Sequence, residues 1–258
     1  MQKEFAKNAV EVLKDDDNVI GLTAGGSWLT DELDEYSDLD LILITKEKTA
    51  GNKDLMLEYA NKLGNLLNAF TGEHVGDPRV LICLYDEPLL HVDIKFMTEE
   101  EFHKRVEDPV ILLDKDGRLE EIIGKTEAKF PTPGFQWMED RFWTWVHYTL
   151  VKIGRGEYFE SYDGFGFFRE VIFGPLIHMK NGNQPRGVRR METHIAKEDL
   201  ESIKRTISQY DRKSQIKALE ECVALYKELR DELFTDDVKL NTKTEERVIE
   251  YFNKIKEH

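Results

Sequence analysis

Two acidic residues in alternate positions, Asp38 and Asp40, open an apolar run, and this arrangement constrains the fold more than any other feature. The run 41–44 reads Leu-Ile-Leu-Ile, and an earlier apolar run at 19–22 leads into the turn Gly25-Gly26-Ser27. Alternate side chains of a β-strand point to the same face, so both carboxylates project from one face of the predicted strand. Carboxylates this close repel each other unless a cation lies between them. Oxygen ligands of this kind suit Mg²⁺, which in turn holds substrate phosphates.

The order of these parts resembles the signature of the nucleotidyltransferase superfamily related to DNA polymerase β. That signature is an apolar residue, then Gly-Gly or Gly-Ser, a short spacer and Asp-x-Asp, and the matching residues here are Gly25, Gly26, Ser27, Asp38 and Asp40. Each part alone is typical of an ordinary turn or of a solvated strand end. The resemblance therefore rests on their combination between two apolar strands.

A third carboxylate on a later strand belongs to the same signature, and Asp93 is the candidate. The segment 91–96 alternates polar and apolar residues, as a half-buried strand does. Asp93 is expected to share its face with His91 and Lys95. The resemblance implies that Asp38, Asp40 and Asp93 are catalytic residues that hold Mg²⁺, and that Gly25, Gly26 and Ser27 bind the nucleotide.

The charge of the chain limits its partners. The formal net charge is −15, from 51 acidic and 36 basic residues, which argues against nucleic acid as a partner. An acidic protein can attract a cationic substrate, although many proteins are acidic for solubility alone. The two cysteines, Cys83 and Cys222, have no metal-ligand spacing, and the sequence has neither an N-terminal signal region nor a membrane-spanning run. These features favour a cytoplasmic protein with free thiols that does not bind membranes.

The patterns along the chain predict an α+β fold: an N-terminal nucleotidyltransferase-type mixed sheet with flanking helices, followed by a C-terminal α-helical bundle. The expected domains are 1–128 and 135–258, joined by Pro131-Thr132-Pro133-Gly134. Strands are expected at 18–24, 39–45, 79–86, 89–96 and 109–114, and helices at 3–14, 53–70, 135–154, 157–180 with a break near Pro175, 196–209, 212–234 and 243–256, with a further helix starting after Thr98.

A basic loop in the second half is a candidate for binding phosphates. No acidic residue occurs from Val171 to Met191, although the chain is rich in them. Arginine is well shaped for bidentate contacts with phosphate, so Arg186 and Arg189 are the candidate nucleotide-binding residues. Surface salt bridges to acids elsewhere are the alternative explanation.

The two-domain layout resembles the aminoglycoside and lincosamide adenylyltransferases. That resemblance implies Mg²⁺-dependent transfer of a nucleoside monophosphate, AMP in these families, from a nucleoside triphosphate to a hydroxyl group of a small molecule. A protein acceptor and a catalytically silent nucleotide-binding protein remain alternatives. The general base is left open among Asp93, Glu157, Glu160 and Glu170, and so are the acceptor, the nucleotide base and the oligomeric state.

Overall fold

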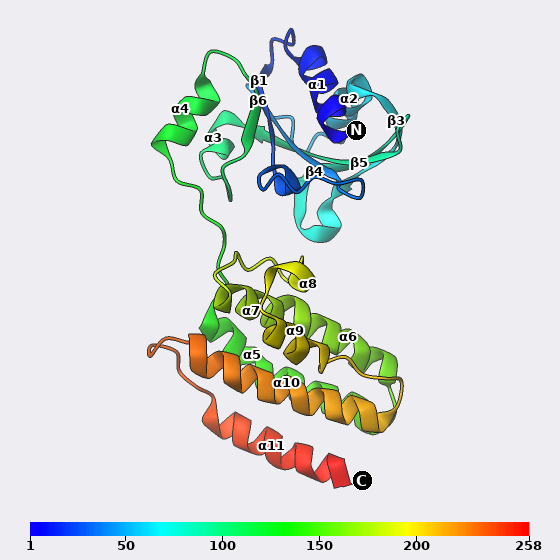
Figure 1. Cartoon of the computed structure of the whole chain (residues 1–258), viewed down its shortest axis with the longest axis vertical. Helices are drawn as coiled ribbons and strands as arrows, with labels where there is room; N and C mark the ends of the chain where they lie inside the picture. Colours follow the sequence, from blue (N-terminus) through cyan, green and yellow to red (C-terminus); the bar gives the residue numbers. More distant parts are fainter. Residues whose placement is uncertain (258) are drawn as a thin grey trace. The chain divides into compact units, whose positions relative to one another are not determined.

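The computed structural model describes residues 1–257, which fall into two compact units, Met1–Phe130 and Pro131–His258. The first unit is built around a mixed sheet, and the second is helical (Figure 1). The α+β fold class expected from the sequence is therefore confirmed. Within residues 1–257, none of the helices is both long and apolar enough to traverse a lipid bilayer.

The first unit contains six strands and four α-helices among its described residues. They are α1 (Gln2–Leu13), β1 (Val19–Ala24), β2 (Leu39–Thr45), α2 (Lys53–Leu63), β3 (Asn65–Gly72), β4 (Asp77–Asp86), β5 (Leu90–Thr98), α3 (Glu99–Phe102), β6 (Val110–Asp114) and α4 (Arg118–Lys125). The strands form one sheet in the order β3-β4-β5-β2-β1-β6. The β2–β5 pair is parallel, and the other neighbouring strands are antiparallel.

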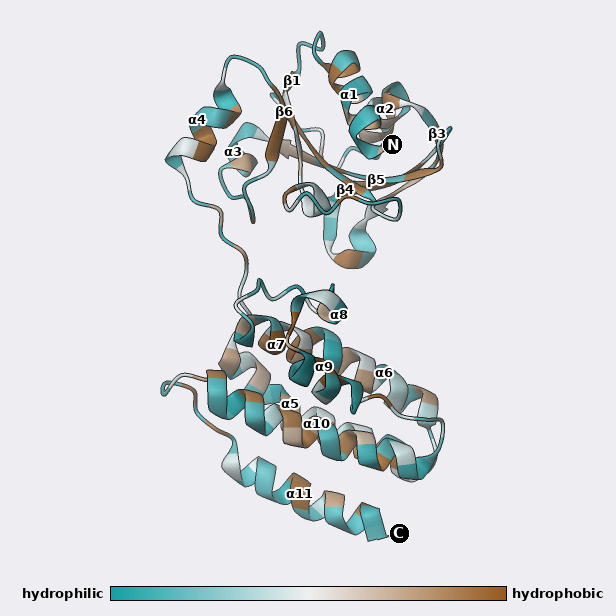
Figure 2. Ribbon diagram, viewed as in Figure 1, coloured by the Kyte–Doolittle hydropathy of each residue, from teal (hydrophilic) through white to brown (hydrophobic). Residues whose placement is uncertain are grey.

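Apolar residues on alternate positions of the central strands cover the two faces of this sheet. One face packs Leu41 and Ile94 against α1 and α2, where Tyr59 and Leu63 are also buried. The opposite face carries a smaller cluster that includes Ile44, and here α3 and α4 cover the sheet. Figure 2 shows the hydrophobic residues concentrated along the strands. The polar positions of β2 and β5 therefore lie on the face that the α1 and α2 helices leave open.

The segment 65–72 corrects the sequence-based expectation. A single helix was expected over 53–70, but α2 ends at Leu63 and the following residues form β3. Gly64 has an extended backbone, with φ of 169°, and ends the helix. Leu66 and Phe70 are four positions apart, which fits one face of a strand as well as one face of a helix. Pairing with β4 decides between them.

The second unit consists of helices α5 (Phe135–Arg155), α6 (Tyr158–Phe168), α7 (Gly174–Lys180), α8 (Met191–His194), α9 (Lys197–Lys204), α10 (Arg212–Leu233) and α11 (Thr242–Glu257). A π-helical turn, Arg169–Phe173, joins α6 to α7. Pro175 lies in the first turn of α7, where its missing N–H costs little. The break expected near this proline is confirmed, and it takes the form of a wider helical turn.

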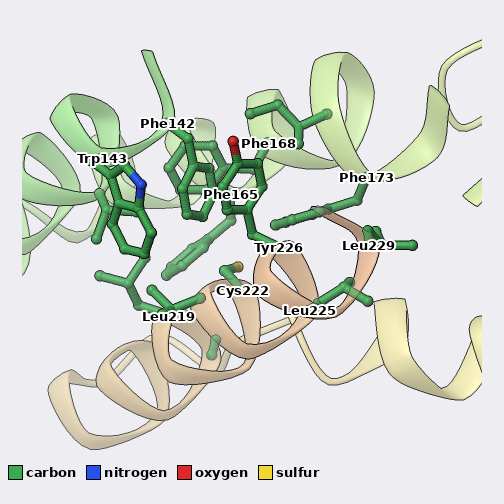
Figure 3. Close-up of a cluster of buried hydrophobic side chains, with 14 of the residues drawn as sticks. Phe142, Trp143, Phe165, Phe168, Phe173, Leu219, Cys222, Leu225, Tyr226 and Leu229 are labelled. Carbon is green, nitrogen blue, oxygen red and sulfur yellow. The ribbon is translucent and has the colours of Figure 1, made fainter. Parts of the chain in front are cut away.

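Aromatic side chains fill the core of the second unit (Figure 3). Phe142 on α5 stacks on Tyr226 of α10, with ring centroids 3.7 Å apart. The buried Tyr226 hydroxyl donates a hydrogen bond of 2.7 Å to Oε2 of Glu139, which is itself buried. Glu139 also accepts a hydrogen bond from the backbone N–H of Asn241, so both of its carboxyl oxygens are hydrogen-bonded inside the core.

Candidate active site

The parallel β2–β5 pair places two acidic residues side by side. Asp40 and Asp93 are direct partners in the register of this pair, and both are half-buried. Leu41 and Ile94, the residues that follow them, are also partners and point into the core beneath α1 and α2. Because side chains alternate along a strand, both carboxylates project from the opposite face. Two of the three acids singled out in the sequence are thus brought together by the backbone.

The glycine turn after β1 lies directly against Asp40. The backbone N–H of Gly25 donates a hydrogen bond of 3.0 Å to the carbonyl oxygen of Asp40. Gly26 has φ of +58°, and a Cβ atom built on it would lie 2.0 Å from Oδ2 of Asp40. Only glycine fits this conformation and this close approach. Ser27 continues the turn in a short 3₁₀ segment, Gly26–Trp28.

Asp38, the other acid of the Asp-x-Asp motif, lies immediately before β2. Its side chain is half-buried and lines an open cavity of about 310 Å³ together with residues 35–37, residues 89–91 and Met1. Among residues 1–257, its carboxylate has no hydrogen-bond or ion-pair partner. Asp38 is therefore available to a ligand that enters from this side.

The polar residues beside Asp93 on β5 divide into two groups. His91 Nε2 lies 2.9 Å from Oδ1 of Asp93, so these two side chains are hydrogen-bonded. Lys95, the next residue on this face, is instead paired with Asp77 of β4 at 2.9 Å. Burial raises the pKa of Asp77, but hydrogen bonds from Arg79 and Lys95 outweigh it and hold that pKa well below its ordinary value. Lys95 therefore compensates Asp77, and His91 is hydrogen-bonded to Asp93.

Glu107 is a site residue that the sequence reasoning missed. Its Oε1 accepts a hydrogen bond of 3.4 Å from the backbone N–H of Gly26. Backbone N–H groups of glycine turns commonly bind phosphate oxygens. The Glu107 carboxylate is bonded to such an N–H group, that of Gly26. Glu107 is far from the motif in sequence and follows no spacing rule. The only sequence signal was its place in an acidic stretch before a predicted strand.

A buried arginine fixes the loop that carries Glu107. Arg105 is 5% exposed, and its guanidinium donates hydrogen bonds to Asp108, to the carbonyl oxygen of Ile123 and to both oxygens of Thr126. These contacts attach the loop to the end of α4. The position of Glu107 next to the glycine turn is therefore built into the fold of the first unit.

The donor set around Asp40 and Asp93 suits a hard divalent cation. Within the described part of the chain, no three His, Cys, Asp or Glu side chains are grouped so that they could hold a metal ion by themselves. Mg²⁺ is usually held by one or two carboxylates together with substrate phosphates and water, so two paired carboxylates are a sufficient protein contribution. The chemistry of the residues present fits Mg²⁺ that arrives with a nucleotide.

The two candidate arginines belong to the loop between α7 and α8. The Arg186 guanidinium donates to Oε1 of Gln184, at 2.6 Å from Nη2. Arg189 has an exposed side chain, while its carbonyl oxygen lies 2.9 Å from Nε2 of the buried His178. Oε2 of Glu170, on the π-helical turn, accepts a hydrogen bond of 3.4 Å from the backbone N–H of Val188. The buried His178 and the exposed Glu170 thus both contact this loop, and its role in nucleotide binding remains a prediction.

The other acids considered as a general base have structural partners. Lys152 pairs with Glu157 at 2.7 Å and with Glu160 at 2.8 Å. Glu160 also accepts a hydrogen bond from the Tyr148 hydroxyl, and these bonds from Lys152 and Tyr148 lower the pKa of Glu160. A carboxylate with a lowered pKa is a poor proton acceptor. Glu170 supports the loop at Val188.

The comparison with protein families decides where the chain belongs. The family described as streptomycin adenylyltransferase matches residues 1–255. The chain belongs to this family. It is therefore a nucleotidyltransferase, as the motif at Gly25–Asp40 indicated, and ATP is the co-substrate of adenylyltransferases.

Two solved structures are similar to this member of the streptomycin adenylyltransferase family over nearly its whole length. An aminoglycoside 6-adenyltransferase from Bacillus subtilis is 16% identical, with a TM-score of 0.41, and the match covers 99% of this chain and 98% of that one. A spectinomycin adenyltransferase from Enterococcus faecialis, solved with ATP and spectinomycin, is 13% identical, with a TM-score of 0.34, and the match covers 100% of both chains. A comparison with curated protein sequences gave no match.

Proposed function

We propose that this chain transfers AMP from ATP to a hydroxyl group of a small, cationic, aminoglycoside-type acceptor. The observation that carries the proposal is the pairing of Asp40 with Asp93 beside a glycine turn that only Gly26 can form against Asp40. Paired carboxylates next to a glycine turn suit a metal-bound triphosphate. The match to the streptomycin adenylyltransferase family supports both the nucleotide and the class of acceptor.

Asp38, Asp40 and Asp93 are the residues proposed to hold Mg²⁺, and Asp40 and Asp93 are register partners in the sheet. Bound there, Mg²⁺ would neutralise the triphosphate and help to orient its α-phosphorus for in-line attack. We propose that the reaction depends on Mg²⁺ held by these carboxylates, and that the enzyme uses ATP in preference to other nucleoside triphosphates. Catalysis would rest mainly on positioning and charge neutralisation.

The remaining roles, phosphate binding and acceptor orientation, are proposed for backbone and side-chain groups of the protein. The backbone N–H groups of Gly26 and Ser27 are proposed to hold phosphate oxygens, with the Gly26 N–H exchanging the Glu107 carboxylate for phosphate. Arg186 and Arg189 are proposed to bind the triphosphate through bidentate contacts. Asp93 is also proposed to orient the acceptor hydroxyl or to take its proton, and its hydrogen bond to His91 supports a fixed orientation of its carboxylate.

The proposal is tested by mass spectrometry of acceptors after incubation with the full chain, Mg²⁺ and each of the four nucleoside triphosphates. The acceptor panel contains streptomycin, spectinomycin and a lincosamide, together with several purified proteins. Asp40→Asn is the control variant, because it keeps the shape of the side chain and removes its charge. The expected result is a mass gain of one AMP on an aminoglycoside, seen with ATP and wild type only.

Three results would contradict the proposal. An equal mass gain with Asp40→Asn would remove Asp40 from the metal site. A mass gain on proteins alone would assign the chain to protein modification, and no gain on any acceptor would favour a silent nucleotide-binding protein.

A further inference from the structure

The cavity beside Asp38 is formed wholly by the first unit. Its lining consists of the polar residues Glu35, Tyr36, Ser37, Asp38 and His91 and the apolar residues Met1, Leu89 and Leu90. Its volume is about 310 Å³, the size of a small ring with its substituents. Asp38 lies two residues before Asp40 in the chain, and His91 is hydrogen-bonded to Asp93. The cavity therefore opens next to the paired carboxylates of β2 and β5.

Two acidic side chains of this lining have no partner within the described chain. The carboxylates of Glu35 and Asp38 have no hydrogen-bond or ion-pair partner among residues 1–257. The Tyr36 ring is 86% exposed, so its face is available for contact. Two carboxylates and an open aromatic face together attract a cation, by Coulomb attraction and by cation–π contact.

The loop that carries Glu35 and Tyr36 is fixed from both sides, although the two side chains are exposed. The buried Gln2 of α1 donates hydrogen bonds to the carbonyl oxygens of Asp34 and Ser37, at 2.9 and 2.7 Å. The Asp34 carboxylate accepts from the Tyr36 N–H and from the Ser37 hydroxyl, both at 2.9 Å. A rigid loop that presents free charged and aromatic groups has already lost the entropy that binding would otherwise cost.

We infer that this cavity binds a positively charged ring of the acceptor, one that carries ammonium or guanidinium groups, and so sets the acceptor hydroxyl beside Asp38 and Asp93. Glu35 pairs with one of its cationic groups, and the face of Tyr36 stacks on the ring. The inference rests on the proposed function, because it assigns the acceptor end of the same reaction. It assigns recognition of the acceptor to Glu35 and Tyr36, which have no part in phosphate binding.

The test measures steady-state transfer by the full chain with streptomycin, which carries guanidinium groups, as the variable acceptor. The variants are Glu35→Gln, Tyr36→Ala and Tyr36→Phe, with Glu100→Gln as the matched control, because Glu100 is an exposed acid on α3. Glu35→Gln and Tyr36→Ala should each raise KM for the acceptor about threefold to fivefold, with kcat and KM for ATP unchanged. Tyr36→Phe keeps the ring and should behave as wild type, like Glu100→Gln.

Calorimetric titration of streptomycin into the nucleotide-free chain separates this inference from the proposed function. Binding that weakens in Glu35→Gln and Tyr36→Ala supports the cavity even if wild type transfers nothing to streptomycin, and in that case only the proposed reaction fails. Transfer or binding that is the same in wild type, Glu35→Gln and Tyr36→Ala would overturn the cavity assignment while leaving the reaction intact. Equal binding of an uncharged methyl glycoside, or no binding of streptomycin at all, would overturn it too.

Discussion

Asp40 and Asp93 are register partners across the parallel β2–β5 pair, so the distance between their backbones is set by the sheet itself. A slip of one residue in this register would turn one of the two side chains into the core beneath α1 and α2. That core contains Leu41 and Ile94. Burying an unpaired carboxylate among apolar side chains costs more free energy than a folded domain can lose. The hydrophobic pattern of the sheet therefore enforces the pairing of the two acids.

Asp93→Asn should abolish most of the transfer activity while the fold survives. The amide keeps the size of the side chain and its hydrogen bond to His91, but it removes the charge proposed to face the metal. We expect a loss of about a hundredfold or more in kcat, with thermal stability near that of wild type. Asp54→Asn, at an exposed acid on α2, is the control. Full activity in Asp93→Asn would show that the paired carboxylates do not act together.

Gly26→Ala and Gly76→Ala should both lower the stability of the protein, but only Gly26→Ala should lower its transfer activity. Both glycines have positive φ, +58° and +83°, so alanine costs each about 1 kcal/mol of unfolding free energy. A Cβ at Gly26 would also lie 2.0 Å from Oδ2 of Asp40, whereas a Cβ at Gly76 would meet open space. Denaturant unfolding gives the stability of each variant, and transfer rates give its activity. An active Gly26→Ala would mean that the carboxylate of Asp40 can move without loss of function.

Arg189→Ala should weaken nucleotide binding without affecting the acceptor. Its exposed guanidinium has no hydrogen-bond or ion-pair partner in the described residues, so the substitution disturbs no internal contact. If Arg189 binds phosphate, KM for ATP should rise about tenfold, and KM for the acceptor should not change. Arg155→Ala, at an exposed position at the end of α5, is the matched control. Equal values of KM for ATP in the two variants would remove Arg189 from the nucleotide site.

His178 should make the second unit sensitive to mild acid. Burial lowers the pKa of His178, whose Nε2 lies 2.9 Å from the carbonyl oxygen of Arg189. As the pH falls through the ordinary histidine value of about 6.5, the unfolded chain takes up a proton before the folded chain does, so the free energy of unfolding decreases. Denaturant unfolding at about pH 7.5 and about pH 5.5 should show a larger decrease for wild type than for His178→Gln. The same decrease in both proteins would show that His178 is not the cause of the loss of stability in acid.

The sequence located the central strands and their acids because each depends on a local pattern. The alternation at 91–96 and the apolar run after Asp40 are confirmed as β5 and β2. The helix start after Thr98 is also confirmed, and the structure shows the complete capping box with Glu101. In contrast, β3 was mistaken for the end of α2, because its apolar spacing fits both periods and its pairing with β4 is not local.

The parts of the candidate site that the sequence missed are held together by contacts between distant segments. Glu107 reaches Gly26 only because Arg105 attaches its loop to the end of α4. The cavity requires Gln2 of α1 to hold the loop that carries Glu35. No spacing rule connects such residues, since each contact depends on how the sheet and its helices pack.

The attachment of residues 34–37 to Gln2 also bears on how this protein can diverge. Because Gln2 contacts only backbone carbonyl oxygens of the loop, the side chains at positions 35 and 36 can be exchanged without loosening it. Asp40 and Asp93 lie on the strands, outside that loop. If Glu35 and Tyr36 recognise the acceptor as proposed, selection for a new acceptor can act on two exposed positions while the residues proposed for the reaction stay unchanged.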